Sequence, residues 1–136
     1  MRFILSLAAI GLIGTAVVAA SPMQEERAAK EAAALQKAIA GKVAGKPRGC
    51  ISLSRITRSQ IIGENAIIYR ESSNKFFVNT PPGGCSGLRE GRALITRIPS
   101  DRLCSGDIAR VADLTLGFEG AACTLGEFTP YTKVRG

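Results

Sequence analysis

Apolar and polar residues alternate after residue 50 of this chain, and the alternation returns in several short segments. Residues 51–54 have the period of two that is typical of a half-buried strand. The alternation slips near Arg55 and Ile56, where we expect a bulge or a bend. Residues 66–70 and 75–80 are the next two strands, with turn signals at 63–65 and 72–74. The pattern therefore predicts two successive hairpins, which form a meander.

Later segments add further short strands. Pro81, Pro82, Gly83 and Gly84 interrupt the pattern, and residues 93–98 form a fourth strand that ends at Pro99. A tight turn at 104–107 precedes a fifth strand at 108–114, and a glycine-rich loop at 117–122 leads to a short last strand at 125–128. Five or six short strands at regular spacing predict a small barrel or sandwich. The expected core residues are Ile51, Leu53, Ile68, Phe77, Leu94, Ile98, Ile108, Val111 and Phe128.

Residues 23–40 are rich in alanine, glutamate, lysine and glutamine, which favour a helix. Gly41 supplies the stop signal. The apolar face of this helix is thin, because Leu35 and Ile39 are its large apolar residues. We therefore expect a spacer that is partly frayed in solution, with docking on a partner as the alternative. Residues 42–49 are expected to be a flexible connection, so the predicted class is all-β, preceded by an N-terminal helix.

The first twenty residues have the three parts of a secretory signal peptide. Arg2 is followed by an uncharged apolar run over 4–20, and the small residues Val18 and Ala20 predict cleavage after Ala20. A membrane anchor is the alternative, although the run is slightly short for a span. The predicted organisation is a signal peptide over 1–20, a helix and linker over 21–49, and one β domain over 50–136. The expected location is the periplasm or the exterior of a Gram-negative-type bacterium, with no stable membrane span after cleavage.

Four cysteines lie in the predicted mature chain: Cys50, Cys85, Cys104 and Cys123. An even number of cysteines in an exported domain predicts two disulfides. The alternative is a structural zinc site, but such sites bring their ligands in close pairs, and this chain has neither close pairs nor histidine. Of the three pairings that four cysteines allow, we expect Cys50 with Cys123 and Cys85 with Cys104. Each bridge should contribute about 2–4 kcal/mol to stability.

Four sequence segments together resemble a family of small exported bacterial proteins that is known only as a domain of unknown function. They are Cys-Ile-Ser-Leu from Cys50, Phe-Val-Asn-Thr-Pro-Pro from Phe77, Leu-Cys-Ser-Gly-Asp-Ile from Leu103 and Cys-Thr-Leu-Gly-Glu-Phe from Cys123. The resemblance covers roughly residues 35 to 130. The resemblance implies export and disulfides. The family has no assigned activity, so the resemblance leaves the function open.

The composition excludes several kinds of catalysis. Histidine is absent, so a Ser-His-Asp triad or a Cys-His pair cannot form. All four thiols have expected disulfide partners, and the chain has no phosphate loop, dinucleotide fingerprint or calcium loop. We predict no catalytic residue, no metal site and no cofactor. A small enzyme, or an inhibitor of one, stays the alternative, with a concave site where Asp101, Asp107 and Asn79 would converge.

Positive charge is the remaining feature. The chain has a net charge of +7, and arginine side chains bind carboxylates and phosphates well. Nucleic acid is an unsuitable partner for the predicted compartment, and few aromatic residues are present to stack on bases. The sequence therefore predicts a non-enzymatic envelope domain that binds an anionic envelope component or an acidic protein. Dispersed arginines that only keep the surface soluble are the alternative. The candidate anion-binding residues are Arg55, Arg58, Arg70, Arg97 and Arg110.

Overall fold

A computed structural model describes residue 14 and residues 16–134 of the chain. The predicted signal peptide over 1–20 therefore lies mostly outside the described residues, and its cleavage stays a prediction. In the described part of the chain, no helix combines the length and the apolarity needed to cross a membrane.

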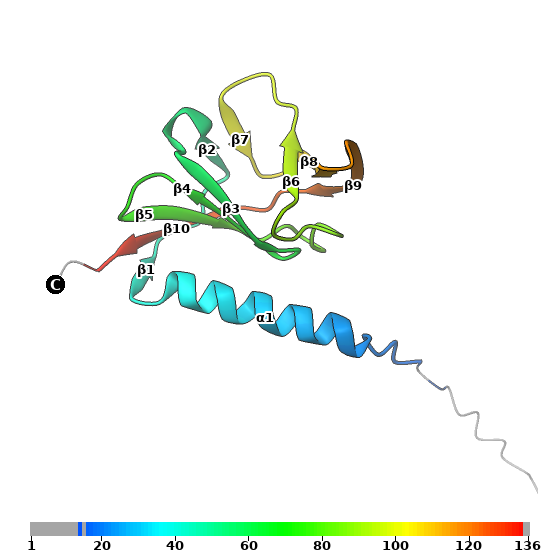
Figure 1. Cartoon of the computed structure of the whole chain (residues 1–136). Coiled ribbons are helices and arrows are strands. Elements are labelled where there is room, and N and C mark those ends of the chain that lie inside the picture. The colour runs from blue at the N-terminus through cyan, green and yellow to red at the C-terminus, as the bar shows by residue number, and fades with distance from the viewer. Residues whose placement is uncertain (1–13, 15, 135–136) are drawn as a thin grey trace, which may run out of the picture.

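The described residues form one α-helix, one short 3-10 helix and ten strands (Figure 1). The helices are α1 (Pro22–Ile39) and η1 (Leu53–Arg55). The strands are β1 (Lys42–Ala44), β2 (Cys50–Ser52), β3 (Arg58–Gly63), β4 (Ala66–Arg70), β5 (Lys75–Asn79), β6 (Ala93–Thr96), β7 (Arg102–Cys104), β8 (Ile108–Asp113), β9 (Phe118–Thr124) and β10 (Phe128–Lys133). The predicted class, mostly β with an N-terminal helix, is confirmed.

Three antiparallel sheets make up the β part of the described chain. The largest has the order β1-β10-β5-β4-β3, and the smaller ones are β2-β7 and β6-β8-β9. Helix α1 covers one face of the five-stranded sheet, and the two smaller sheets lie on the opposite side (Figure 1). The result is a layered arrangement in which the five-stranded sheet lies in the middle, so a closed barrel is not formed by the described residues.

The predicted meander is confirmed, because β3, β4 and β5 are joined by two hairpins. The second of these strands has the predicted bounds, Ala66–Arg70. Near Arg55 the chain forms the 3-10 helix η1, which separates β2 from β3. The register shift between β3 and β4 lies at the other end of the hairpin, between Ile61 and Gly63.

The predicted number of strands is wrong, because the described residues contain ten. Strand β1 occupies residues 42–44 of the expected flexible connection over 42–49, and β7 ends at Cys104, the first residue of the expected turn at 104–107. Of the expected glycine-rich loop at 117–122, residues 118–122 belong to β9 and Gly117 lies in the turn before it. Pairing with β8 stabilises this strand, although its glycine and alanine residues have a low strand propensity. The last strand begins at Phe128, the residue at which it was expected to end.

The main core lies between the five-stranded sheet and the two smaller sheets. Five of the expected core residues are buried: Ile51, Phe77, Val111 and Phe128 belong to this core, and Ile68 belongs to the smaller core beneath α1. Leu53, Leu94 and Ile98 are partly buried and pack against the main core. Ile108 was wrongly assigned to it and is 64% exposed, because Ala109 and Val111 occupy the inward positions of β8.

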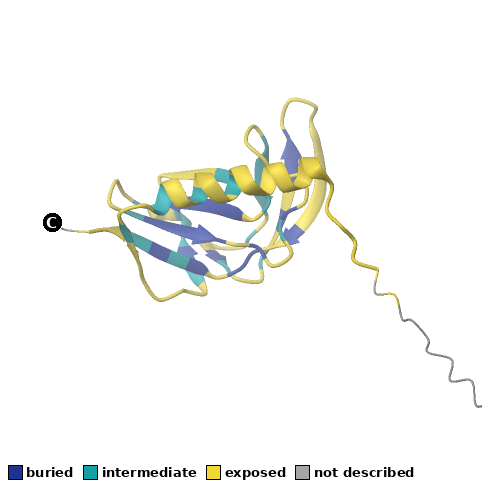
Figure 2. Cartoon of the chain, turned by 90° about the horizontal axis from the view of Figure 1, so that it is seen from below, coloured by how far each residue is buried: buried dark blue, intermediate teal, exposed yellow. Residues whose placement is uncertain are grey.

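Helix α1 packs on the five-stranded sheet and is therefore more than a spacer. Its N-terminus has a capping box, in which Ser21 Oγ accepts from Gln24 N and Gln24 Oε1 accepts from Ser21 N. Its sparse apolar face is sufficient, because Leu35 and Ile39 contact a second small core around Phe76. The outer face of the helix remains exposed (Figure 2).

Both disulfides are confirmed, but the expected pairing is wrong. The bonds join Cys50 to Cys104 and Cys85 to Cys123. The reason is the pairing of β2 with β7, which places Cys50 directly opposite Cys104 with their Cα atoms 4.0 Å apart. The second bridge ties the proline- and glycine-rich loop after β5 to β9. Two disulfides fit an oxidising compartment.

Candidate anion-binding site

Every strand of the five-stranded sheet carries a basic residue at the same end of the sheet. In an antiparallel sheet, the first residue of one strand lies beside the last residue of the next. Arg58 begins β3, Arg70 ends β4 and Lys75 begins β5 at this end. Lys133 ends β10 directly opposite Lys42, which begins β1. We call these five residues the basic end.

Four residues form one continuous row across this end of the sheet. In the strand register, Arg58 lies opposite Arg70, Arg70 lies opposite Phe76, and Phe76 lies opposite Tyr131. Residues directly opposite each other in neighbouring strands point to the same face. Phe76 and Tyr131 belong to the core beneath α1, so the two arginines are also on the face that α1 covers.

The aromatic pair in this row supports two cations. The rings of Phe76 and Tyr131 are stacked, with centroids 5.6 Å apart. The Arg70 guanidinium lies 5.3 Å from the Phe76 centroid, and Lys42 Nζ lies 5.5 Å from it. Lys42 Nζ also donates to the carbonyl of Ala38 at 2.9 Å, in the last turn of α1, where the helix dipole favours a cation. Neither contact neutralises the positive charge.

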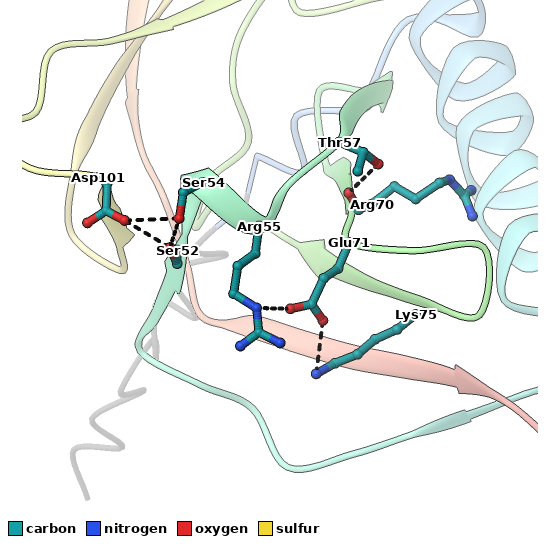
Figure 3. Close-up of polar contacts among 8 residues, drawn as sticks. All are labelled: Ser52, Ser54, Arg55, Thr57, Arg70, Glu71, Lys75 and Asp101. Carbon is teal, nitrogen blue, oxygen red and sulfur yellow. Dashed lines mark hydrogen bonds and ion pairs between the residues drawn. The ribbon is translucent and has the colours of Figure 1, made fainter.

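Arg58 and Arg70 face each other without a carboxylate between them. Like charges directly opposite in a sheet are destabilising. Neither arginine forms an ion pair with a described acidic residue. Thr57 fixes this end of β3, because its N–H and its hydroxyl donate to the carbonyl of Arg70 at 2.8 and 3.1 Å (Figure 3). Guanidinium groups form charge-assisted hydrogen bonds with carboxylates and phosphates, which are therefore the anions that suit this pair.

A second group of cations lies on the other face of the sheet at this end. Glu71 accepts from Arg55 Nε at 2.7 Å and from Lys75 Nζ at 3.1 Å (Figure 3). Lys75 also lines a cavity of about 450 Å³ together with Lys46 and Arg48. Glu71 is the carboxylate in these contacts, so the cations outnumber the acidic groups on this face too.

The predicted set of five arginines is divided among three places. Arg58 and Arg70 are brought together, and Arg55 is paired with Glu71. Arg97 and Arg110 lie in the region of the three-stranded sheet, where Arg97 forms two hydrogen bonds to Glu119 and Arg110 Nε is 4.0 Å from it. The hydrogen bond from Arg97 lowers the pKa of Glu119, and Arg110 contributes to the same direction. Glu119 thus offsets one of these two positive charges.

The lysines of the basic end and its aromatic pair were missed by the sequence analysis. A usable signal was present, because Arg70 and Lys75 flank the predicted turn at 72–74. A hairpin places the residues that flank its turn at one end of the sheet. Lys42 and Lys133 could not be found in this way, because the strands that carry them were not predicted with these bounds.

The acidic and amide residues of the alternative enzyme site have local structural roles. Asp101 Oδ2 accepts from the hydroxyls of Ser52 and Ser54 at 2.9 and 3.3 Å (Figure 3). Asp107 accepts from the Cys104 N–H at 2.7 Å, and Asn79 is buried against Gly126. None of Asp101, Asp107 and Asn79 lines the largest cavity. Among the described residues, no cluster of three or more metal-ligating side chains is present.

Comparison with known proteins gives no relative from which a function could be transferred. The chain matches no protein-family model, no curated protein and no solved structure. The resemblance to the family of small exported proteins therefore stays a prediction, and the function is argued from the geometry of the basic end.

Proposed function

We propose that the protein is a non-enzymatic, exported domain that binds an anionic component of the cell envelope through its basic end. The observation that supports this most strongly is the Arg58–Arg70 pair. The two arginines are directly opposite each other in the register of β3 and β4, and like charges at such positions cost stability unless an anion offsets them. A phosphate or a carboxylate suits this arrangement, because each guanidinium presents a planar fork of donors.

The surroundings of the pair support the same proposal. The Phe76 ring contacts the cationic groups of Arg70 and Lys42, and these contacts leave their charge unneutralised. Export, which the N-terminal sequence and the two disulfides support, would place peptidoglycan and lipid headgroups within reach of this surface. Attraction between exposed charges is screened by salt, so binding should weaken as ionic strength rises.

Replacing Arg58 and Arg70 together with glutamine should weaken binding to the anionic partner about thirty-fold. Each lost charge-assisted hydrogen bond contributes about 1 kcal/mol or more, and about 1.4 kcal/mol corresponds to a factor of ten. The measurement is co-sedimentation of the oxidised protein, residues 21–136, with isolated sacculi and, separately, with phosphatidylglycerol vesicles, at low and high salt. Binding to sacculi would identify peptidoglycan as the source of the anion, and binding to vesicles would identify a lipid headgroup.

The matched control replaces Arg97 and Arg110 with glutamine. This variant loses the same formal charge from a place where both arginines contact the carboxylate of Glu119, which offsets one of the two charges. It should bind within about two-fold of the unchanged protein, since exposed paired charges contribute little. Equal losses in both variants would show that only net charge matters. An absence of binding in both arms would remove the proposal.

A further inference from the structure

The largest cavity of the described residues follows the free edge of β3. Strand β3 is at one edge of the five-stranded sheet, and β6 is at one edge of the three-stranded sheet. Between them lies a groove of about 600 Å³, lined in part by Ser59, Gln60 and Ile61 from β3 and by Ala93, Leu94 and Thr96 from β6. Figure 1 shows β6 beside β3 with no strand between them.

The groove offers both main-chain and side-chain contacts to an extended chain. An edge strand presents unpaired N–H and C=O groups, which are a template for another strand. The floor is apolar, with Ile67 and Leu103 buried beneath the groove. Tyr69 also lines it, and burial raises the pKa of its hydroxyl, which therefore stays protonated. The six residues of β3 span about 20 Å, enough to pair with a peptide of similar length.

The two ends of the groove differ in charge. Arg58 begins β3 at one end, beside Arg70. Glu31 and Glu64 meet at the other end of β3, where Glu31 Oε1 accepts from the Glu64 N–H at 3.2 Å. Glu90 and Arg92 also line the groove, and the charge of Arg92 is offset by its ion pair with Asp113 at 3.0 Å. A strand antiparallel to β3 would have its C-terminal end near Arg58 and its N-terminal end near the carboxylates of Glu31 and Glu64. The charges of a free peptide, positive at its start and negative at its end, match this polarity.

We propose that the groove between β3 and β6 binds an extended peptide, which adds to β3 as an antiparallel strand with its carboxylate end at Arg58. In this mode of recognition, main-chain hydrogen bonds give the affinity and alternate side chains give the specificity. Binding of the peptide requires the free edge of β3 and the groove. The proposed anionic envelope partner shares Arg58 with the peptide but requires neither the free edge nor the groove, so a variant that blocks the groove separates the two proposals.

The test uses the probe peptide Lys-Val-Thr-Val-Thr-Val-Glu with free termini, titrated into the oxidised, nitrogen-15-labelled protein, residues 21–136. Amide signals of residues 59–62 and 93–96 should shift, and the β3 amides should become protected from hydrogen exchange. The reversed peptide, Glu-Val-Thr-Val-Thr-Val-Lys with an acetylated N-terminus and a C-terminal amide, has the same side chains, the same net charge and the opposite polarity. It should bind about five-fold more weakly, which corresponds to about 1 kcal/mol of lost charge complementarity.

Ser59→Trp fills the groove from an exposed position and should abolish the shifts, whereas Ser73→Trp, in the exposed β4–β5 turn, should leave them unchanged. Three results would overturn the proposal. One is the absence of shifts with both peptides, and another is equal binding by the Ser59→Trp variant. The third is concentration-dependent shifts of the same amides without peptide, which would assign the edge to self-association. Vesicle or sacculus binding that persists in the Ser59→Trp variant would leave the proposed function intact.

Discussion

Replacing Cys85 and Cys123 together with serine is expected to lower the free energy of unfolding by about 4 kcal/mol or more. The bridge closes a loop of 38 residues, and the loop-entropy relation gives about 4 kcal/mol for a loop of this length. Cys85 is completely buried in the main core, so a serine hydroxyl there also loses its solvation. Small domains have only about 5–15 kcal/mol of stability, so this loss should bring unfolding close to ambient conditions.

The second bridge provides a matched control for this prediction. Cys50 and Cys104 close a loop of 54 residues, for which the same relation also gives about 4 kcal/mol. Both of these cysteines are only partly buried, so their serine pair should lose little beyond the entropic part. Urea unfolding followed by circular dichroism measures both variants. A smaller loss for the Cys85/Cys123 variant than for the control would contradict the role assigned to burial.

Local sequence signals were sufficient for the part of the fold in which neighbouring strands pair. The turns at 63–65 and 72–74 predicted the β3–β4–β5 meander, because hairpins depend on residues close together in the chain. Strands β1 and β7 depend on distant partners. The pairing of β2 with β7 in turn decides that Cys50 meets Cys104. The disulfide pairing therefore could not be obtained without the long-range register.

The same limit applies to the candidate site. The count of arginines indicated an anionic partner, but it could not separate Arg58 and Arg70 from Arg97 and Arg110. The difference is Glu119, which is 22 residues from Arg97 in sequence and reaches it only across the three-stranded sheet. Strand register likewise brings the aromatic pair of Phe76 and Tyr131 under the cations.

Asn79→Leu is expected to cost about 2–6 kcal/mol of stability, with little change in side-chain volume. Asn79 is completely buried at the end of β5. Its Nδ2 donates to the Gly126 carbonyl at 2.7 Å, and its Oδ1 accepts from the Gly126 N–H at 3.0 Å. Leucine would leave both backbone groups without partners in the interior, and each unsatisfied buried group costs about 1–3 kcal/mol. A Cβ on Gly126 would clash with the Thr80 carbonyl, so this close approach also requires glycine.

Urea unfolding of Asn79→Leu should be compared with Asn65→Leu, an exposed asparagine whose Nδ2 makes one long bond of 3.4 Å to Glu31. This control should change stability by less than about 1 kcal/mol. Asn79→Asp gives a further test, because only a protonated carboxyl can donate to the Gly126 carbonyl. Burial would raise the pKa of that carboxyl in the folded state, so its stabilising form is present at acid pH and is lost as the pH rises through the folded pKa. The difference in free energy of unfolding between Asn79→Asp and the unchanged protein should therefore become smaller as the pH falls towards about 4. Two results would show that the paired hydrogen bonds to Gly126 do not hold the end of β5 in place. One is a stability difference for Asn79→Asp that is independent of pH, and the other is an Asn79→Leu variant as stable as Asn65→Leu.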